Sequence, residues 1–324
     1  MAAVWLGTAP MAAAGPGCDP GELEIKFSHV VATKGHPKGE AAEALAERIG
    51  TELDGRACMT VYPNSTLYSD NDVLEAILAG DVHLAAPSLS KFEAYTTRFR
   101  LFDLPFLFED IHAIFRFEAT DEAEELKRAM VDQGLIGLAY WHNGLKQISA
   151  NRPLVAPGDA QGLVFRVQPS EVLVAQIEAL GATPKKLAFK DVYGALASGD
   201  VDGQENTWSN IYTKDFYTVQ DGVTETNHGL INYLLVTSTA FLDSLDPSLR
   251  LDFERIVKEV THEYNRFSFE LNELAKRKMR RAGTKIRRLN RREREAWVTA
   301  FRPVWERFSE EIGQDLIRQA AGTQ

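Results

Sequence analysis

Hydrophobic and polar positions follow two regular spacings along most of the chain. Strict alternation predicts β-strands, and recurrence at every third or fourth position predicts helices with one apolar face. The expected strands are 24–31, 57–62, 135–140, 146–150 and 163–168, and the expected shorter helices are 39–53, 72–79 and 170–180. Because strands and helices follow one another in turn, the pattern predicts an α/β protein with mostly parallel sheets.

One helical pattern is much longer than the others. It begins at Asp246-Pro247, a cap residue followed by a first-turn proline, and stops at Gly283. A helix of about 36 residues would be roughly 54 Å long, which exceeds the width of one lobe. Since no strict heptad is sustained, we expect a brace across two lobes rather than a coiled coil. A last helix is expected around 303–320.

A short internal echo suggests two similar halves. Residues 72–83 can be laid on residues 191–202 with six identities in twelve positions, and each copy reads as a helix, a glycine stop and the entry to a strand. Chance is one explanation, because this local solution is common. The alternative is two α/β lobes that use the same helix-to-strand step. Two such lobes would enclose a cleft at the carboxyl ends of their strands.

Charge is unevenly distributed. The formal net charge is -10, from 36 Lys+Arg and 46 Asp+Glu. Residues 276–294, here called the basic strip, hold eleven basic side chains and one acid, so they carry +10 and the rest of the chain carries -20. The strip is read as a solvated helix face with the following turn, or as a surface for an acidic partner or nucleic acid. The acidic total argues against a general nucleic-acid binder.

The N-terminal twenty residues are set apart by composition. Residues 1–20 are small and apolar, with no charge before Asp19, and Ala12 to Gly15 resembles the end of a secretory signal. The positively charged start of such a signal is missing, so it looks truncated; a plain tail is the alternative. On the export reading, the mature chain begins near Cys18 to Gly21. Two cysteines are too few for a disulfide scaffold, and Cys58 is expected as a small buried hydrophobe.

Several classes of protein are disfavoured. No apolar stretch is long enough to span a membrane. The common phosphate-binding, dinucleotide-binding, hydrolase and zinc-protease motifs are missing, as is any CxxC. The seven histidines are scattered without metal-ligand spacing. We therefore expect no catalytic set, no metal site and no cofactor.

Polar groups on predicted strand ends are the remaining candidates for function. Arg166 lies in a strand between Phe165 and Val167, where its burial would be costly without a partner. It either forms a salt bridge with a neighbouring acid or offers its planar fork to a ligand carboxylate. Lys146 begins another strand, and Asn206 follows the second echo helix, where a loop facing the cleft is expected.

Several longer motifs resemble one known family. The chain is similar over about residues 22–320 to the periplasmic solute-binding subunits of tripartite ATP-independent periplasmic (TRAP) transporters, the DctP type. The landmarks are FSHVVATKGHPKG at 27–39, VYPNSTLYSD at 61–70, LFDLPFLFED at 101–110, HNGLKQISANRPL at 142–154, GLVFRVQPSEVLVAQIEALGATP at 162–184 and VYGALASGDVDGQENTWSNIYTKDFYTVQ at 192–220. The resemblance implies the two-lobed periplasmic binding protein fold, with a cleft between lobes and a long bracing helix. The expected lobes are 21–143 with about 230–265, and 144–229 with about 266–324.

The resemblance also implies roles for particular residues. Arg166 would form the main salt bridge to a substrate carboxylate, Asn206 would fix that arginine and the ligand, and Lys146 would supply a second cation. The motifs FSHVVA, APSLSKF (86–92), NGLKQ and QENTWSN are most similar to those of the four-carbon dicarboxylate subgroup. Further pocket contacts implied in this way are His29, Lys38, Ser88, Gln168 and Trp208.

Two points stay open at the level of sequence. Lys38 has an alternative reading as a surface residue, and the chain departs from the usual dicarboxylate pattern at Lys34-Gly35-His36. The resemblance implies a periplasmic, non-enzymatic protein that captures malate, succinate or fumarate and delivers it to a TRAP permease. The alternatives are another carboxylate ligand (a keto, sugar or aromatic acid), a ligand-sensing module, or an enzyme in which Glu205 acts near Arg166.

Overall fold

The strands form two separate mixed sheets. The computed structural model describes residues 18–322. The first sheet has the order β2-β1-β3-β10-β4 and the second the order β11-β9-β5-β8-β6-β7. The strands are β1 (Leu23–Ser28), β2 (Ala57–Tyr62), β3 (Leu84–Ala85), β4 (Leu135–Leu145), β5 (Gln147–Ala150), β6 (Val164–Val167), β7 (Thr183–Lys186), β8 (Gly203–Asn206), β9 (Gly222–Glu225), β10 (Leu230–Ser238) and β11 (Lys285–Arg288).

The sheets are less parallel than the alternation of elements predicts. β1 pairs in parallel with β2 and β3, and β6 with β7 and β8, as expected for β-α-β units. β10 instead runs antiparallel to β3 and β4, and β5 runs antiparallel to β8 and β9. The chain crosses between the sheets at the β4–β5 junction and again between β9 and β10. These two crossings, and a third after β10, since β11 belongs to the second sheet, connect a first-sheet lobe with a second-sheet lobe.

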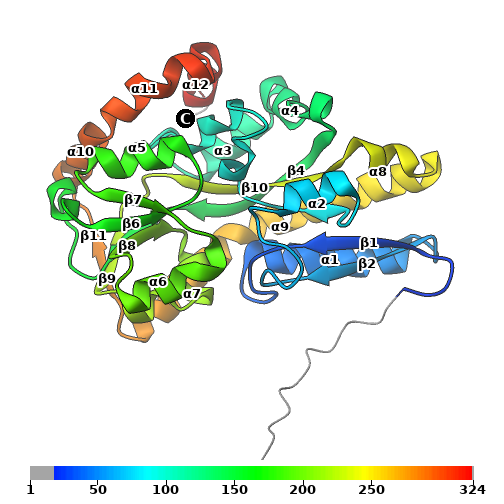
Figure 1. Cartoon of the computed structure of the whole chain (residues 1–324), viewed down its shortest axis with the longest axis horizontal. Helices are drawn as coiled ribbons and strands as arrows, with labels where there is room; N and C mark the ends of the chain where they lie inside the picture. The colour runs from blue at the N-terminus through cyan, green and yellow to red at the C-terminus, as the bar shows by residue number, and fades with distance from the viewer. Residues whose placement is uncertain (1–17, 323–324) are drawn as a thin grey trace, which may run out of the picture.

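Helices cover the sheets, as Figure 1 shows. The shorter ones are α1 (Pro37–Glu52), α2 (Val73–Ala79), α3 (Ile111–Glu118), α4 (Asp121–Lys127), α5 (Glu171–Ala179), α6 (Val192–Ser198), α7 (Trp208–Thr213) and α8 (Thr239–Ser244). The echo is confirmed as a repeated step: Gly80 ends α2 at φ 79° and Gly199 ends α6 at φ 76°. Such left-handed ends favour glycine, because a side chain would be strained there. The two strands that follow, β3 and β8, belong to different sheets.

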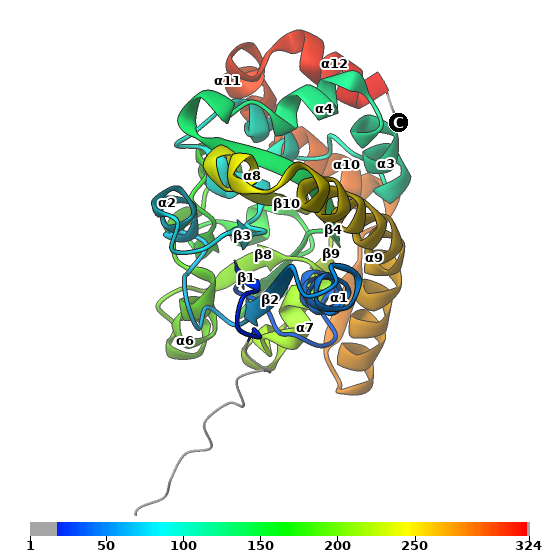
Figure 2. The same ribbon diagram turned by 90° about the vertical axis from the view of Figure 1, so that its right-hand side faces the viewer.

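The long helix is confirmed and contacts both lobes. α9 spans Pro247–Arg281, with the side chain of Asp246 accepting a hydrogen bond from the backbone NH of Ser248 at its start. It packs on α1 and β4 in the first-sheet lobe and on α7 in the second-sheet lobe. Figure 2 shows it running along one side of the molecule. Phe253 and Ile256 are buried in the core under the first sheet, whereas Ala275 and Met279 join the apolar cluster around α6 and α7.

The C-terminal region differs in part from the expectation. The predicted helix at 303–320 is two helices, α11 (Arg302–Ile312) and α12 (Gln314–Gly322), which are separated at Gly313 with φ 103°. A preceding helix, α10 (Arg291–Ala300), was not expected from the apolar pattern, because Trp297 is the buried hydrophobic anchor in a mostly charged segment. Phe301, Val304 and Phe308 pack in a core that includes residues of α3 and α5. No helix in the described part of the chain is long and apolar enough to cross a membrane.

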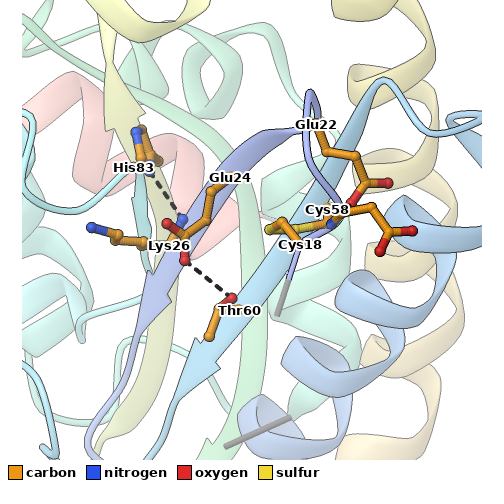
Figure 3. The surroundings of a disulfide bond; sticks show 8 residues. Cys18, Glu22, Glu24, Lys26, Cys58, Thr60 and His83 are labelled. Atoms are coloured by element: carbon orange, nitrogen blue, oxygen red, sulfur yellow. Dashed lines mark hydrogen bonds between the residues drawn. A yellow bond between two sulfur atoms is a disulfide. The ribbon is translucent and has the colours of Figure 1, made fainter. Parts of the chain in front are cut away.

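The expectation for the cysteines was wrong. Cys58 is half-buried in β2 and forms a disulfide with Cys18, their Cα atoms being 5.6 Å apart (Figure 3). The bond joins the segment before β1 to its parallel neighbour, where Glu24 lies opposite Cys58 in the register. Crossing 40 residues of sequence, it restricts the unfolded chain and ties down the start of the first sheet. The signal-like residues 1–17 lie outside the described part of the chain.

Candidate anion-binding site

A small cavity lies where the two lobes meet. We call it the anion cavity. Its walls come from both lobes: Val30, Val31, Asp70, Ser88, Lys91, Ile231 and Tyr233 from one, and Arg166, Gln168, Phe189, Asn206 and Asn210 from the other. The mixture of apolar walls with a few convergent polar groups is typical of a small-molecule site.

Arg166 is the central feature of the cavity. It lies in β6, with its side chain only 2% exposed, and its Nε and Nη2 atoms donate to the carbonyl oxygen of Leu187 at 3.1 and 3.0 Å. Among the described residues it forms no ion pair, so the salt-bridge reading of its burial is excluded. Burial lowers the pKa of Arg166 to about 10, and the charges of Glu205 and Asp70 oppose this shift. A buried guanidinium without a counterion is costly, and an anionic ligand would remove that cost.

Asn206 lines the same cavity but does not hold Arg166. Its Oδ1 accepts hydrogen bonds from Asn210 Nδ2 at 2.5 Å and from the backbone NH of Thr207 at 3.2 Å. The carbonyl of Leu187, not Asn206, therefore fixes the arginine in this structure. β8 delivers Asn206 to the cavity because Gly203 allows close packing: a Cβ there would lie 2.4 Å from the ring of Phe165.

Lys146 does not reach the anion cavity. Its ammonium is buried, donates to Glu205 Oε1 at 3.2 Å and lies 3.0 Å from Oε2 of the same carboxylate as an ion pair. His228 Nε2 lies 3.4 Å from the same carboxylate. Burial alone would raise the pKa of Glu205, but Lys146 and His228 outweigh it and lower that pKa to about 2. Lys146 is thus paired with Glu205 and does not line the cavity, where the family resemblance implied a second cation.

The other lobe supplies two cations: Lys91 lines the cavity, and Lys38 lies behind its wall residue Tyr233. Lys91, which the sequence reasoning missed, lines the cavity and donates from Nζ to Asn71 Oδ1 at 2.6 Å. Lys38 is buried, not a surface residue; its Nζ donates to the carbonyl of Ala86 at 2.8 Å and lies 4.0 Å from the ring centroid of Tyr233. Burial lowers the pKa of each lysine to about 8. The signal for Lys91 was present, since it belongs to the APSLSKF motif that contains Ser88.

The remaining expected contacts divide into two groups. Ser88 and Gln168 both line the cavity, and Gln168 Nε2 donates to Ser88 Oγ from one lobe to the other. His29 is buried but does not line the cavity. Its neighbours Val30 and Val31 do line it. Burial and the nearby Lys38 lower the pKa of His29 well below its usual value. Trp208 lines a different hollow, with Phe269 and Asn227.

The loop that departs from the family pattern joins the two lobes. His36 caps the start of α1, and its Nδ1 accepts a hydrogen bond from the backbone NH of Lys38. Its Nε2 lies 2.6 Å from Asn210 Oδ1 on α7, and Lys214 Nζ donates to Asn64 Oδ1 at 3.0 Å. Together with the Ser88–Gln168 bond, these contacts connect the lobes around the cavity. The structure therefore shows the closed arrangement.

Two lobes closed around a buried, unpaired arginine define a binding protein for a small anion. This chain belongs to the family described as bacterial extracellular solute-binding protein, family 7 (DctP), whose model matches residues 27–311. It is 55% identical over 303 residues, 94% of this chain and 91% of the relative, to the C4-dicarboxylate-binding periplasmic protein DctP of Vibrio cholerae.

Two solved structures give the same fold. A TRAP periplasmic solute-binding protein from Shewanella oneidensis with bound succinate has a TM-score of 0.92 at 43% identity, covering 93% of this chain and 99% of that one. A second, from Pseudomonas aeruginosa with bound L-malate, has a TM-score of 0.86 at 45% identity, covering 88% and 99%. The expected fold class, two α/β lobes with a bracing helix, is confirmed.

Proposed function

We propose that this protein captures a four-carbon dicarboxylate, such as succinate, malate or fumarate, outside the cytoplasm and delivers it to a TRAP-type membrane permease. The observation that carries the proposal is Arg166: a fully buried guanidinium at a cavity wall, with no acidic partner in residues 18–322. The similarity to proteins described with succinate, L-malate and C4-dicarboxylates supports this choice of ligand.

The two ends of the ligand would be held by different lobes. Arg166 would bind one carboxylate with the guanidinium edge that Leu187 leaves free, and Asn206 would add an amide NH. Lys91 and Ser88 would bind the other carboxylate, and Lys38 would add positive potential through the ring of Tyr233. The apolar walls Val31 and Ile231 suit the short carbon chain between the two carboxylates.

Ligand binding would favour the closed lobes. Arg166 and Lys91 lie in different lobes, so a dicarboxylate reaches both only when the cleft is closed. The crossings beside Lys146 and His228 are held by the buried Lys146–Glu205 pair and by the bond from the backbone NH of Lys146 to the carbonyl of Gly229 at 2.8 Å. The proposed lobes are residues 21–143 with about 230–265, and residues 144–229 with about 266–324. The boundaries between them lie at these crossings and inside α9.

Location and chemistry fit a carrier better than an enzyme. The disulfide between Cys18 and Cys58 suits an oxidising compartment such as the periplasm. Glu205 is tied to Lys146 and His228 and holds its proton only in strong acid, so it is a poor general acid. We therefore propose transport without catalysis.

Titration calorimetry tests the proposal directly. The protein is stripped of ligand by unfolding and refolding with its disulfide intact. It is then titrated with succinate, L-malate, fumarate, a keto acid, a sugar acid and an aromatic acid. We expect the four-carbon dicarboxylates to bind at least about tenfold more tightly than the others, since only they place one carboxylate at each end of the cavity. If another class of acid binds more tightly, that class is the ligand instead of a four-carbon dicarboxylate. If none of these acids binds, the proposal is rejected.

A further inference from the structure

The anion cavity has one acidic side chain in its wall. Asp70 lies in the turn before α2, and no other Asp or Glu of residues 18–322 lines the cavity. Its carboxylate has no hydrogen bond and no ion pair with any described residue. A carboxylate at the wall of an anion site opposes the ligand that the site binds, so its presence requires a physical reason.

The cations around the cavity supply that reason. The negative charge of Asp70 favours the protonated forms of Lys38, Lys91 and Arg166. These three cations and Asp70 carry a net charge of +2, which matches a dianion. Neither Lys38 nor Lys214 lines the cavity. Lys38 is counted because its ammonium is buried directly behind the wall residue Tyr233, whereas Lys214 is only half-buried and its ammonium donates to Asn64. Without Asp70, the cavity would have an excess of positive charge over a dicarboxylate.

We propose that Asp70 sets the charge of the ligand that the anion cavity accepts, favouring dianions over trianions. This inference rests on the proposed binding of dicarboxylates and adds the residue that limits their charge. A trianion leaves its third charge beside Asp70 without a free cation, so repulsion from Asp70 weakens its binding. A monoanion has too little negative charge and leaves one of the buried cations without a partner, so it also binds weakly.

The experiment compares ligands of increasing charge on the wild type and on Asp70→Asn. Dissociation constants are measured by calorimetry for butyrate, succinate, L-malate and propane-1,2,3-tricarboxylate. The asparagine keeps the shape and one acceptor oxygen but removes the charge. We expect the preference for succinate over the tricarboxylate to fall by about tenfold, and the preference for succinate over butyrate to rise by roughly the same factor, because Coulomb repulsion scales with ligand charge.

Asp72→Asn is the matched control, since it removes the same charge two residues away. Asp72 is exposed, lies outside the cavity wall and accepts a hydrogen bond from Ser69 Oγ. Asp72 also favours the charged form of Lys91, but less than Asp70 does, and water screens its exposed charge. We therefore expect both ligand preferences to stay within about twofold of the wild type. Melting temperatures check that both variants are folded.

The outcomes separate this inference from the function on which it rests. If the wild type binds succinate but Asp70→Asn changes neither preference by more than about twofold, the inference fails and the proposed function stands. A selective loss of L-malate relative to succinate would mean that Asp70 accepts the ligand hydroxyl, which also overturns the charge role. If the wild type binds none of the dicarboxylates, both fail. Should the tricarboxylate be too bulky to bind either protein, the ratio of succinate to butyrate decides.

Discussion

The anion cavity and the basic strip both hold several cations, but they differ in how far water reaches them. Arg166 and Lys38 are 2% and 1% exposed, and the arginine has no acidic partner among the described residues. The basic strip occupies the end of α9, then β11 and the start of α10, and most of its side chains are exposed. The basic strip carries more charge, whereas the cations at the cavity are shielded from water.

Part of the strip is paired with acidic side chains. Lys285 and Arg287 pair with Asp221, and Lys276 and Arg288 pair with Glu225, both acids of the neighbouring β9 region. The remaining exposed arginines lie in water and in the last turn of α9, where cations complement the helix dipole. Exposed ion pairs of this kind contribute little energy each. On the proposed function, burial without a counterion locates the anion site, and the number of cations does not.

Replacing the arginine in the cavity should give the largest effect. We expect Arg166→Ala to weaken succinate binding by roughly 2–5 kcal/mol, because it removes one partner of a desolvated charge pair. Arg166→Lys should also bind weakly, since an ammonium cannot reproduce the planar fork. The measurement is titration calorimetry with succinate and L-malate.

Arg281→Ala provides the control from the basic strip. Arg281 is exposed in the last turn of α9 and has no ion-pair partner within residues 18–322. We expect its removal to change the affinity for succinate by less than about twofold, because surface charges at this distance are screened by salt. Similar losses in Arg166→Ala and Arg281→Ala would contradict the distinction between buried and exposed cations.

A second prediction concerns Lys146, a buried cation that we assign to the fold and not to the ligand. We expect Lys146→Met to reduce the free energy of unfolding by about 3 kcal/mol, because it leaves Glu205 buried without its partner. Urea denaturation measures this loss. The affinity of the folded protein for succinate should stay within about threefold.

Lys276→Met is the matched control in the strip. Its partner Glu225 is nearer the surface and keeps Arg288, so we expect a loss of only about 1 kcal/mol. A tenfold loss of succinate affinity in Lys146→Met, at unchanged stability, would return Lys146 to the role that the family resemblance implied.

The sequence was sufficient for the elements and for one end of the site. Period-two and helical patterns located β2, α2, α5 and the long helix α9 within a few residues, because each has a regular apolar face. Arg166 could be recognised since a charged residue between Phe165 and Val167 in a strand is unusual. The echo led to two lobes because Gly80 and Gly199 are required by the same backbone geometry.

The other end of the site depends on contacts between distant segments. Lys146 meets Glu205 because the antiparallel pairing of β5 and β8 places Gln147 opposite Asn206 and Ile148 opposite Glu205, and sequence spacing does not encode that register. Lys91 lies in a 3₁₀ turn, where no long apolar period shows which way a side chain points. The disulfide depends on the pairing of β1 with β2 in the same way.

The last prediction uses pH, to which the cavity lysines should respond and the exposed strip should not. Lys38 and Lys91 have pKa values of about 8 in the empty protein because burial disfavours their charged forms. For both, Asp70 favours the charged form and the neighbouring Lys214 or Arg166 opposes it. A bound carboxylate stabilises the protonated lysines and raises their pKa, so binding takes up protons above about pH 8.

Affinity for succinate should therefore be constant from about pH 6 to 7.5 and fall as pH rises through 8, by roughly five- to tenfold per lysine between pH 8 and 9. Lys91→Met should bind more weakly at pH 7 and lose less affinity over that interval, because one titrating group has been removed.

The ligand-free protein should show the opposite trend. Folding lowers the pKa of the lysine, so the free energy of unfolding rises with pH between the folded pKa near 8 and the unfolded pKa near 10.5. The affinities are measured by calorimetry at pH 7, 8 and 9 for the wild type, Lys91→Met and the strip variant Lys278→Met. We expect Lys278→Met to show the same pH dependence as the wild type. An affinity that stayed constant up to pH 9 would show that neither lysine has to be charged for the ligand to bind, and the distal carboxylate would then depend on Ser88 and neutral donors.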